Sequence, residues 1–369
     1  MLIIGAKKRK NDNDCCQIIK KTESRRCVQI KILVGISGGV DSAVVASELK
    51  NQGHEVEGCV LIMHEYCDLD SARSVASDIG IKLHEVDARD AFENIVKENF
   101  STEYLAGRTP NPCVLCNERV KFKALYDFAM ERGFDKIATG HYADISYENG
   151  RYAIKRSTNT AKDQSYMLYR LPQHILEKLM LPLCDFDKKK VRSIAESENI
   201  SVSGKKDSQE ICFLPDGRYA EYIESVKGPC LEGNFVDADG RILGKHKGII
   251  HYTVGQRKGL GIALGARAFV TEICPQTNEI TLEYSMKGKE EIRLSDVVFC
   301  GIQPPNEGGV TLELPVKLRY TAPLVTAKCE LFNDGTAILR FENSVIAAPG
   351  QSAVAYIDDM VAFGGYINN

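Results

Sequence analysis

The sequence contains no tryptophan, no secretory signal and no apolar run of about 18 residues that could cross a membrane. Its net charge is only -3 at pH 7, so overall charge predicts no nucleic-acid partner and any polyanion site must be a local basic patch. The missing tryptophan excludes no class of protein. The 44% hydrophobic and 26% charged residues are typical of a soluble globular protein, and 369 residues predict two or three domains.

Thirteen cysteines are present, an odd number that does not fit a closed disulfide framework. Without a secretory signal we expect a reducing cytosol, where most cysteines remain thiols. Cys113 and Cys116 form a C-x-x-C pair in the predicted loop Leu105 to Asn117. No second C-x-x-C or H-x-x-x-H completes a structural zinc site. A redox pair, a nucleophile, and an iron–sulfur ligand set completed by a distant cysteine all stay open.

A glycine- and serine-rich loop, SGGVDS, follows an apolar run within Ile30 to Ser47. The apolar residues before Ser37 predict a buried parallel strand, and the spacing after Asp41 predicts a helix. Glycines between a strand and a helix aim backbone N–H groups at an anion at the positive end of the helix. The stretch therefore predicts a phosphate site, in which Asp41 either caps the helix or orients a loop group or a metal ion.

Strands and helices alternate from residue 31 to residue 139, which predicts a parallel sheet with helices on both faces. Ligands of such sheets lie beyond the carboxyl ends of the strands. Both SGGVDS and the segment TGHYA follow predicted strands and so belong to that edge. The first predicted strand ends at Val34 to Ile36, and the others are predicted at Val56 to Ile62, Lys82 to Val86 and Lys136 to Thr139.

The character of the chain changes near residue 217, after which predicted helices nearly vanish. The segment HYTVGQRKGLGI is flexible and basic, as suits a loop that touches phosphate, and alternating runs from about residue 280 predict a small β-barrel. Residues 1–29 are predicted to be a disordered basic tail without assigned function. Taken alone, residues 162–169 indicate a polar turn, Lys188 to Ile200 a helix with a solvated face, and Cys212 a buried core thiol.

Eight segments together, in this order, resemble the tRNA-specific 2-thiouridylases, which are ATP pyrophosphatases of the N-type. The segments are GISGGVDSAVVA, GRTPNPCVLCN, ATGHYA, KDQSYMLY, DSQEICF, YTVGQRKGLGI, RYTAP and PGQSAVAY. The resemblance runs from residue 35 to near the C-terminus and implies an α/β plus β fold. It divides the chain into a PP-loop catalytic domain at residues 30–205, a central domain at 206–272 and a tRNA-binding β-barrel at 273–369.

The resemblance also implies a reaction with ATP and Mg²⁺. ATP adenylates the C2 oxygen of uridine 34 in tRNA, and sulfur then displaces AMP. In the family a cysteine at the position of Cys212 carries the sulfur as a persulfide, and Cys116 matches its catalytic partner. The implied partners are a tRNA carrying U34 and a sulfur donor, such as a cysteine desulfurase or a relay protein, in the cytoplasm and without a membrane.

Individual binding positions carry over residue by residue. Those matching nucleotide contacts are Gly35, Ile36, Ser37, Gly38, Gly39, Val40, Asp41, Ser42, Leu61 and Gly140. Those matching tRNA contacts are Asn111, Pro112, Cys113, His141, Lys162, Asp163, Gln164, Arg319, Tyr320 and Gln351.

Two positions depart from the family pattern. Many members have aspartate at the position of Cys113, so this chain has three thiols, Cys113, Cys116 and Cys212, that match the ligand number of a [4Fe-4S] cluster with one open iron. Cluster-held sulfide is therefore the alternative to a persulfide. Leu61 stands where methionine is usual, in a region without the common insertion.

Two other functions compete with tRNA thiolation. An ATP pyrophosphatase that makes an amide or guanidino product would need no cysteines near the loop. An inactive tRNA-binding protein would have a damaged SGGVDS loop or lack the cysteines. The intact loop and the three cysteines argue against both.

Overall fold

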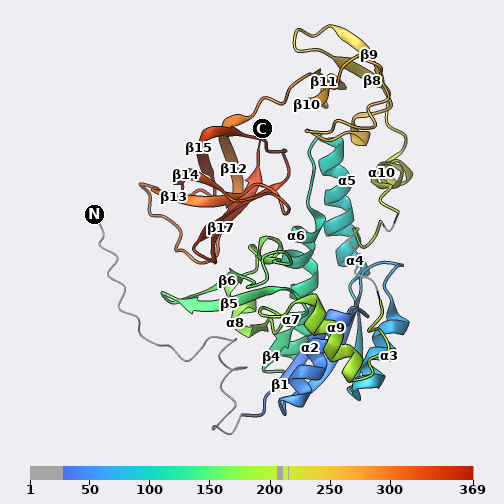
Figure 1. Ribbon diagram of the computed structural model, residues 1–369, viewed down its shortest axis with the longest axis vertical. Helices are drawn as coiled ribbons and strands as arrows, with labels where there is room; N and C mark the ends of the chain where they lie inside the picture. Colours follow the sequence, from blue (N-terminus) through green and yellow to red (C-terminus); the bar gives the residue numbers. More distant parts are fainter. Residues whose placement is uncertain (1–27, 206–210, 215, 369) are drawn as a thin grey trace.

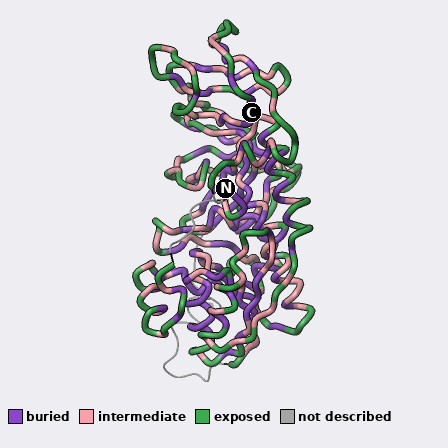
Figure 2. Tube along the Cα trace, turned by 90° about the vertical axis from the view of Figure 1, so that its right-hand side faces the viewer, coloured by how far each residue is buried: buried purple, intermediate pink, exposed green. Residues whose placement is uncertain are grey.

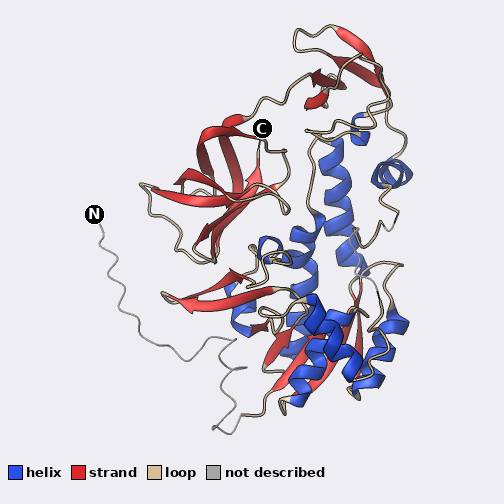
Figure 3. Ribbon diagram, in the orientation of Figure 1, coloured by secondary structure: helices blue, strands red, loops and turns tan. Residues whose placement is uncertain are grey.

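The computed structural model describes residues 28–205, 211–214 and 216–368. The predicted basic tail at residues 1–29 falls almost wholly outside these described residues. Helices gather in the first domain and in the arm that leaves it, and the remainder of the described chain is mostly strands (Figure 3). No helix in the described part of the chain is long and apolar enough to cross a membrane.

The first domain is built on a five-stranded parallel sheet with the strand order β3-β2-β1-β4-β7. Its strands are β1 (Lys31–Gly35), β2 (Glu55–Ile62), β3 (Leu83–Asp87), β4 (Lys136–Ala138) and β7 (Leu179–Met180). The helices around it are α2 (Val40–Asn51), α3 (Leu69–Ile79), α7 (Phe122–Glu131), α8 (Gln173–Lys178) and α9 (Lys188–Ser197). The predicted parallel α/β fold is confirmed.

The central strand β1 shows why helices cover both faces of this sheet. Ile32, Leu33 and Val34 are all fully buried. Successive side chains of a strand point to opposite faces. Ile32 and Val34 accordingly pack in the cluster that contains α2 and α9, whereas Leu33 packs with α7. Figure 2 shows buried residues running through the interior of the molecule, with the outer loops exposed.

A helical arm leads away from the sheet and carries the C-x-x-C pair (Figure 1). The predicted loop Leu105 to Asn117 is only partly a loop. It becomes helical at Pro112, because the Asn111 side chain accepts a hydrogen bond from the Cys113 N–H and proline suits the first helical turn. The arm consists of α4 (Arg89–Ala91), the π-helix η1 (Phe92–Lys97), α5 (Glu98–Leu105), α6 (Pro112–Cys116) and the π-helix η2 (Asn117–Lys121).

A small domain with a four-stranded sheet follows. Phe213 and Phe235 of this part pack in one apolar cluster with Phe100 of α5, so the arm and the small domain share a core. The near absence of helices predicted after residue 217 has one exception, α10 (Tyr219–Lys227), beside the short 3-10 helix η4 (Ile249–His251). The strands are β8 (Gly233–Val236), β9 (Ile242–His246), β10 (Phe269–Cys274) and β11 (Glu279–Glu283).

The C-terminal domain is a six-stranded β-barrel, closed by the pairing of β12 with β17. The hairpin of β5 (Ala143–Glu148) and β6 (Arg151–Arg156), which belongs to the first half of the chain, extends the same sheet through β17. The barrel strands are β12 (Lys289–Phe299), β13 (Val310–Lys317), β14 (Val325–Leu331), β15 (Ala337–Val345), β16 (Ser352–Ile357) and β17 (Met360–Ile367). The predicted barrel is confirmed, and the residue bounds given for the three domains stay predictions.

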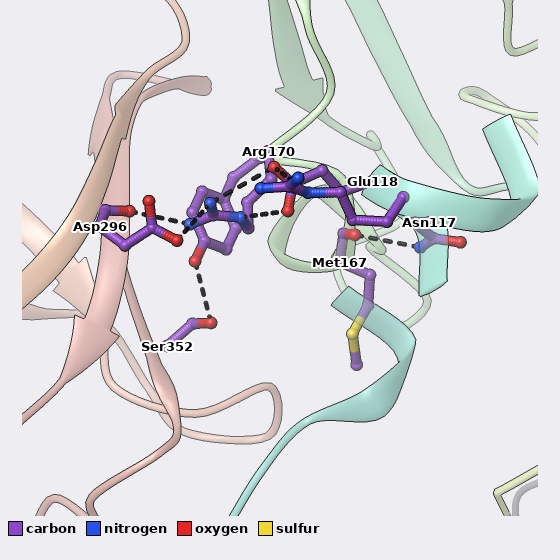
Figure 4. A network of polar contacts seen from close by, with 8 residues as sticks. Asn117, Glu118, Met167, Arg170, Asp296 and Ser352 are labelled. Atoms are coloured by element: carbon purple, nitrogen blue, oxygen red, sulfur yellow. Dashed lines mark hydrogen bonds and ion pairs between the residues drawn. The ribbon is translucent and has the colours of Figure 1, made fainter. Parts of the chain in front are cut away.

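The segment KDQSYMLY joins the barrel to the first domain and is not a simple polar turn. It contains the 3-10 helix η3 (Ser165–Met167), and its Tyr166 and Tyr169 are fully buried and bond to Ser352 of the barrel. The adjacent Arg170 donates to Glu118 at 2.6 Å and to the backbone and side chain of Asp296, both at 2.8 Å (Figure 4).

Candidate active site

The SGGVDS loop joins β1 to α2 at the carboxyl edge of the sheet. The Ser42 hydroxyl donates to the Gly39 carbonyl at 3.0 Å and accepts from the Ser37 N–H at 3.2 Å, which holds the loop in a tight turn. Helix α2 begins after Gly39 without any side-chain cap. Of the roles that the sequence left open for Asp41, capping is therefore excluded.

Two glycines allow neighbouring segments to approach this loop closely. Gly38 has a φ of 72°, and a Cβ atom there would lie 2.9 Å from the Cβ atom of Ser71. A Cβ atom on Gly140 would lie 3.0 Å from Asp41. The predicted nucleotide positions Gly35 to Ser42 and Gly140 thus come together, and Leu61 lies near the end of the neighbouring strand β2.

The Asp41 carboxylate accepts hydrogen bonds from two distant residues. The Lys188 ammonium donates to its two oxygens at 2.9 and 2.7 Å, and the Tyr142 hydroxyl donates to it at 2.7 Å. The Lys188 and Asp41 side chains are 20% and 27% exposed, so solvent only partly screens the pair. The prediction of a solvated face for residues 188–200 is wrong at its first residue.

A second lysine, Lys205, binds the other side of the loop. Its ammonium donates to the Gly38 carbonyl at 3.0 Å and to the Asp68 carboxylate at 2.5 Å. Asp68 caps α3 by accepting from the Ser71 N–H, and the Lys205 bond together with this cap lowers the pKa of Asp68 to about 2. Sequence reasoning missed both lysines. Their chain positions carry no motif by themselves.

Cys116 ends α6 and contacts the residue that follows β2. Its thiol is 6% exposed, and its Sγ atom lies 4.0 Å from the Sδ atom of Met63. Phe213, the neighbour of Cys212, packs in the same apolar cluster as Cys116 and Met63. The structure therefore brings the Cys212 segment close to Cys116, although the two cysteines are 96 positions apart in the sequence. Asp207 to Glu210 of that segment lie outside the described residues.

The cysteines also influence one another electrostatically. Burial raises the pKa of Cys116 to about 11 and that of Cys212 to about 12. Cys113 adds to both increases, and the positive charge of Lys121 opposes both. Such mutual effects require the charges to lie close together. Cys212 is nevertheless exposed, so its interpretation as a core thiol is wrong.

The cysteine group does not fit a metal cluster in the arrangement seen. Among residues 28–205, 211–214 and 216–368, no set of three or more His, Cys, Asp or Glu side chains is placed to hold a metal ion. Cys113 and Cys212 are exposed while Cys116 is buried. No step is therefore derived through a [4Fe-4S] cluster.

Two further residues define the electrostatics of the site. Lys121 ends the π-helix η2, and such π-helical turns frequently occur at functional sites. Burial, with a smaller contribution from the Lys121 charge, lowers the pKa of His141 to about 3. The His141 Nδ1 atom lies 2.9 Å from the Thr139 hydroxyl. Sequence reasoning included His141 and missed Lys121.

The residues matched to tRNA contacts have different environments. Asp163 is buried and accepts from the backbone N–H groups of Ser157 and Ser165. The Gln351 amide donates to the Thr109 carbonyl at 2.7 Å, which ties the barrel to the C-x-x-C segment. Gln164 accepts from the Tyr142 N–H, Lys162 is half-buried, and Arg319 and Tyr320 lie between β13 and β14.

The basic segment predicted to touch phosphate occupies the small domain. It contributes Arg257, Leu260 and Ile262 to a cavity of about 460 Å³, and Arg267 adds a second guanidinium. Polar and apolar groups thus share one open surface. The contact of this segment with phosphate stays a prediction.

Three family models match the chain in succession. They describe a tRNA methyl transferase HUP domain at residues 30–216, a tRNA methyl transferase PRC-barrel domain at 221–283 and an aminomethyltransferase beta-barrel domain at 289–367. The fold and the phosphate loop agree with this order. They define a nucleotide-binding HUP protein with two appended β domains.

Curated relatives identify the family more narrowly. tRNA-specific 2-thiouridylase MnmA 1 of Clostridium tetani is 41% identical over 355 residues, which cover 92% of this chain and 97% of the relative. MnmA 2 of Clostridium botulinum is 43% identical over 347 residues, covering 91% and 98%. The chain belongs to the tRNA-specific 2-thiouridylase family.

A solved structure of NMN synthetase from Francisella tularensis is also similar. It is 16% identical, with a TM-score of 0.33 over 55% of this chain and 78% of that chain. This similarity is too low to bear on function.

Proposed function

We propose that this protein is an ATP-dependent tRNA-uridine 2-sulfurtransferase that acts on uridine 34. One observation carries the proposal. The phosphate loop follows β1, and the Cys116 thiol contacts Met63, which follows β2, so neighbouring parallel strands deliver both groups to one edge of the sheet. An activating site and a sulfur site can therefore act on the same base.

The first step is adenylation of the C2 oxygen. The loop N–H groups, the Ser37 and Ser42 hydroxyls and the α2 N-terminus bind the phosphates of ATP. Mg²⁺ prefers oxygen ligands and is often held by one carboxylate together with substrate phosphates, which fits Asp41; when bound, it neutralises charge on the leaving pyrophosphate. The Lys188 and Lys205 ammonium groups add positive charge on either side of the loop.

The second step is sulfur transfer. Cys212 carries a persulfide, and the Cys116 thiolate attacks its inner sulfur atom, which forms a Cys116–Cys212 disulfide and releases HS⁻. HS⁻ attacks C2 of the adenylated base and AMP leaves. The Cys116 thiolate supplies the electron pair of the new S–S bond, and the electron pair of the broken S–S bond leaves with HS⁻. The close grouping of these thiols beside Lys121 supports this route.

The remaining parts serve the tRNA. We assign the predicted contacts, from Asn111 to Gln351, to the anticodon arm, with the β-barrel as the binding module. A cysteine desulfurase or a relay protein supplies the persulfide sulfur, and the site of action is the cytoplasm.

The test is thiolation in vitro with tRNA that carries U34, ATP and Mg²⁺. We expect Cys212→Ser to release pyrophosphate with tRNA but to form no 2-thiouridine, whereas Cys230→Ser, a half-buried cysteine of the small domain, should behave as the parent protein. Normal thiolation by Cys212→Ser would refute the persulfide role. Iron analysis of anaerobically purified protein distinguishes the persulfide route from cluster-held sulfide. An iron content that rises and falls with activity would favour cluster-held sulfide and contradict the persulfide route.

A further inference from the structure

A fourth thiol, Cys67, lies beside the cysteines already described. It belongs to the connection between β2 and α3, and the Met63 N–H donates to its Sγ atom at 3.3 Å. The side chain of the same Met63 contacts the Cys116 Sγ atom at 4.0 Å. One residue therefore touches both thiols.

The surroundings of Cys67 hold its sulfur atom in place. The Cys67 thiol donates to the Leu61 carbonyl at 3.6 Å, while its Sγ atom accepts from the Met63 N–H. The charge of Cys67 also contributes to the raised pKa values of both Cys116 and Cys212, which places all three sulfur atoms within short electrostatic range.

Cys67 is more accessible than Cys116. Cys116 is only 6% exposed. Cys67 is half-buried and lines a cavity of about 390 Å³ together with Arg89 and Lys97. A cavity of this size, which is also lined by Glu65, Asp90 and Glu93, admits a small thiol.

We propose that Cys67 is the resolving thiol of the sulfur-transfer cycle, a step that rests on the function proposed above. After sulfide leaves, the Cys67 thiolate attacks Cys116 in the Cys116–Cys212 disulfide. The Cys67–Cys116 bond forms, the Cys116–Cys212 bond breaks, and the electron pair leaves with the Cys212 thiolate. Cys212 is then ready for another persulfide. An external dithiol reduces the Cys67–Cys116 disulfide from the cavity and is itself oxidised to a disulfide.

The experiment uses the full chain with persulfide on Cys212. A single turnover with tRNA, ATP and Mg²⁺ proceeds without added thiol, after which free thiols are alkylated and disulfides are mapped by mass spectrometry. The parent protein should contain Cys67 joined to Cys116 and an alkylated Cys212. Cys67→Ser should instead keep the Cys116–Cys212 disulfide.

Turnover rates give a second readout. With dithiothreitol and a continuous sulfur supply, Cys67→Ser should lose about tenfold in steady-state rate while its first turnover is preserved. Cys230→Ser, the matched half-buried cysteine, should change neither. The proposal is overturned if Cys67 of the parent protein is alkylated while Cys116 stays joined to Cys212, or if Cys67→Ser keeps the parent steady-state rate. Failure of the underlying function looks different, because the parent protein would then form no 2-thiouridine even in its first turnover.

Discussion

The positive charge of Lys121 acts on several titratable groups of the sulfur site. It lowers the pKa of Cys116 and of Cys212 against the effect of burial, and it adds to the burial that lowers the pKa of His141. Sulfur transfer needs a thiolate, so the ammonium at the end of η2 raises the reactive fraction at a given pH.

Replacing Lys121 by Met should shift the pH profile of sulfur transfer toward higher pH. Without the positive charge the pKa values of Cys116 and Cys212 rise, so less thiolate is present at neutral pH and the single-turnover rate should fall by about fivefold. Rates of 2-thiouridine formation measured against pH provide the check. Lys123→Met, an exposed lysine on α7 that pairs with Asp127, is the matched control. An unchanged pH profile for Lys121→Met would show that Lys121 does not affect the reactivity of the two thiols.

His54 makes folding stability depend on pH. Its side chain is buried, neither ring nitrogen has a hydrogen-bond partner among the residues that the structure describes, and burial lowers its pKa below 6.5. The unfolded chain therefore binds more protons than the folded chain as pH falls through 6.5 toward the folded-state pKa, and stability is lost in that window.

Urea unfolding at about pH 8 and about pH 5.5 tests this statement. The parent protein should lose more stability between these pH values than His54→Leu, which carries no titratable group there. Equal losses for the two proteins would show that His54 does not contribute.

At the scale of elements, α9 and the segment after it hold the phosphate loop. Lys188 belongs to the first turn of α9 and pairs with Asp41, while Lys205 bonds to the Gly38 carbonyl. Both lysines lie far along the chain from the loop. Their positive charges therefore reach the loop only once the chain has folded.

Lys188→Met should raise the KM for ATP and slow adenylation by about tenfold, because Asp41 loses the cation that holds it. The measurement is tRNA-dependent release of AMP at several ATP concentrations. Lys189→Met changes an exposed neighbour on the same helix and should behave as the parent protein. If Lys188→Met and Lys189→Met have the same KM for ATP, Lys188 does not contribute to ATP binding by the loop.

Elements that carry a local pattern could be predicted from sequence, and contacts between distant elements could not. The β1 strand, the SGGVDS turn and the barrel strands follow from apolar periodicity and glycine placement. Lys188 lies in a lysine-rich helix whose composition predicts only a solvent-exposed face. No local pattern reveals its pairing with the distant Asp41 carboxylate. Cys116 and Cys212 were chosen through the family resemblance, whereas Cys67 and Lys121 become visible only when the fold places them beside these thiols.

At the scale of the whole molecule, Arg170 connects the first domain to the barrel. Its side chain is 3% exposed and bonds to Glu118 within the first half of the chain and to Asp296 of the barrel (Figure 4). Burial of the ion pair makes loss of one partner costly, because the other charge remains without compensation.

Arg170→Met should lower the free energy of unfolding by about 3 kcal/mol and weaken tRNA binding as the barrel loosens. Urea unfolding and tRNA titration are the measurements. The double variant Arg170→Met with Glu118→Gln removes both charges and should recover part of the lost stability. The two charges are not coupled if Glu118→Gln lowers the stability of Arg170→Met as much as it lowers the stability of the parent protein.

The central claim is that one sheet edge first activates the C2 oxygen of uridine and then replaces it by sulfur. The most direct measurement uses tRNA whose uridine 34 carries oxygen-18 at C2, with mass spectrometry of the AMP released as 2-thiouridine forms. The account predicts that the label appears in AMP, since adenylation joins that oxygen to phosphorus before it leaves carbon. Unlabelled AMP, formed together with 2-thiouridine, would contradict it.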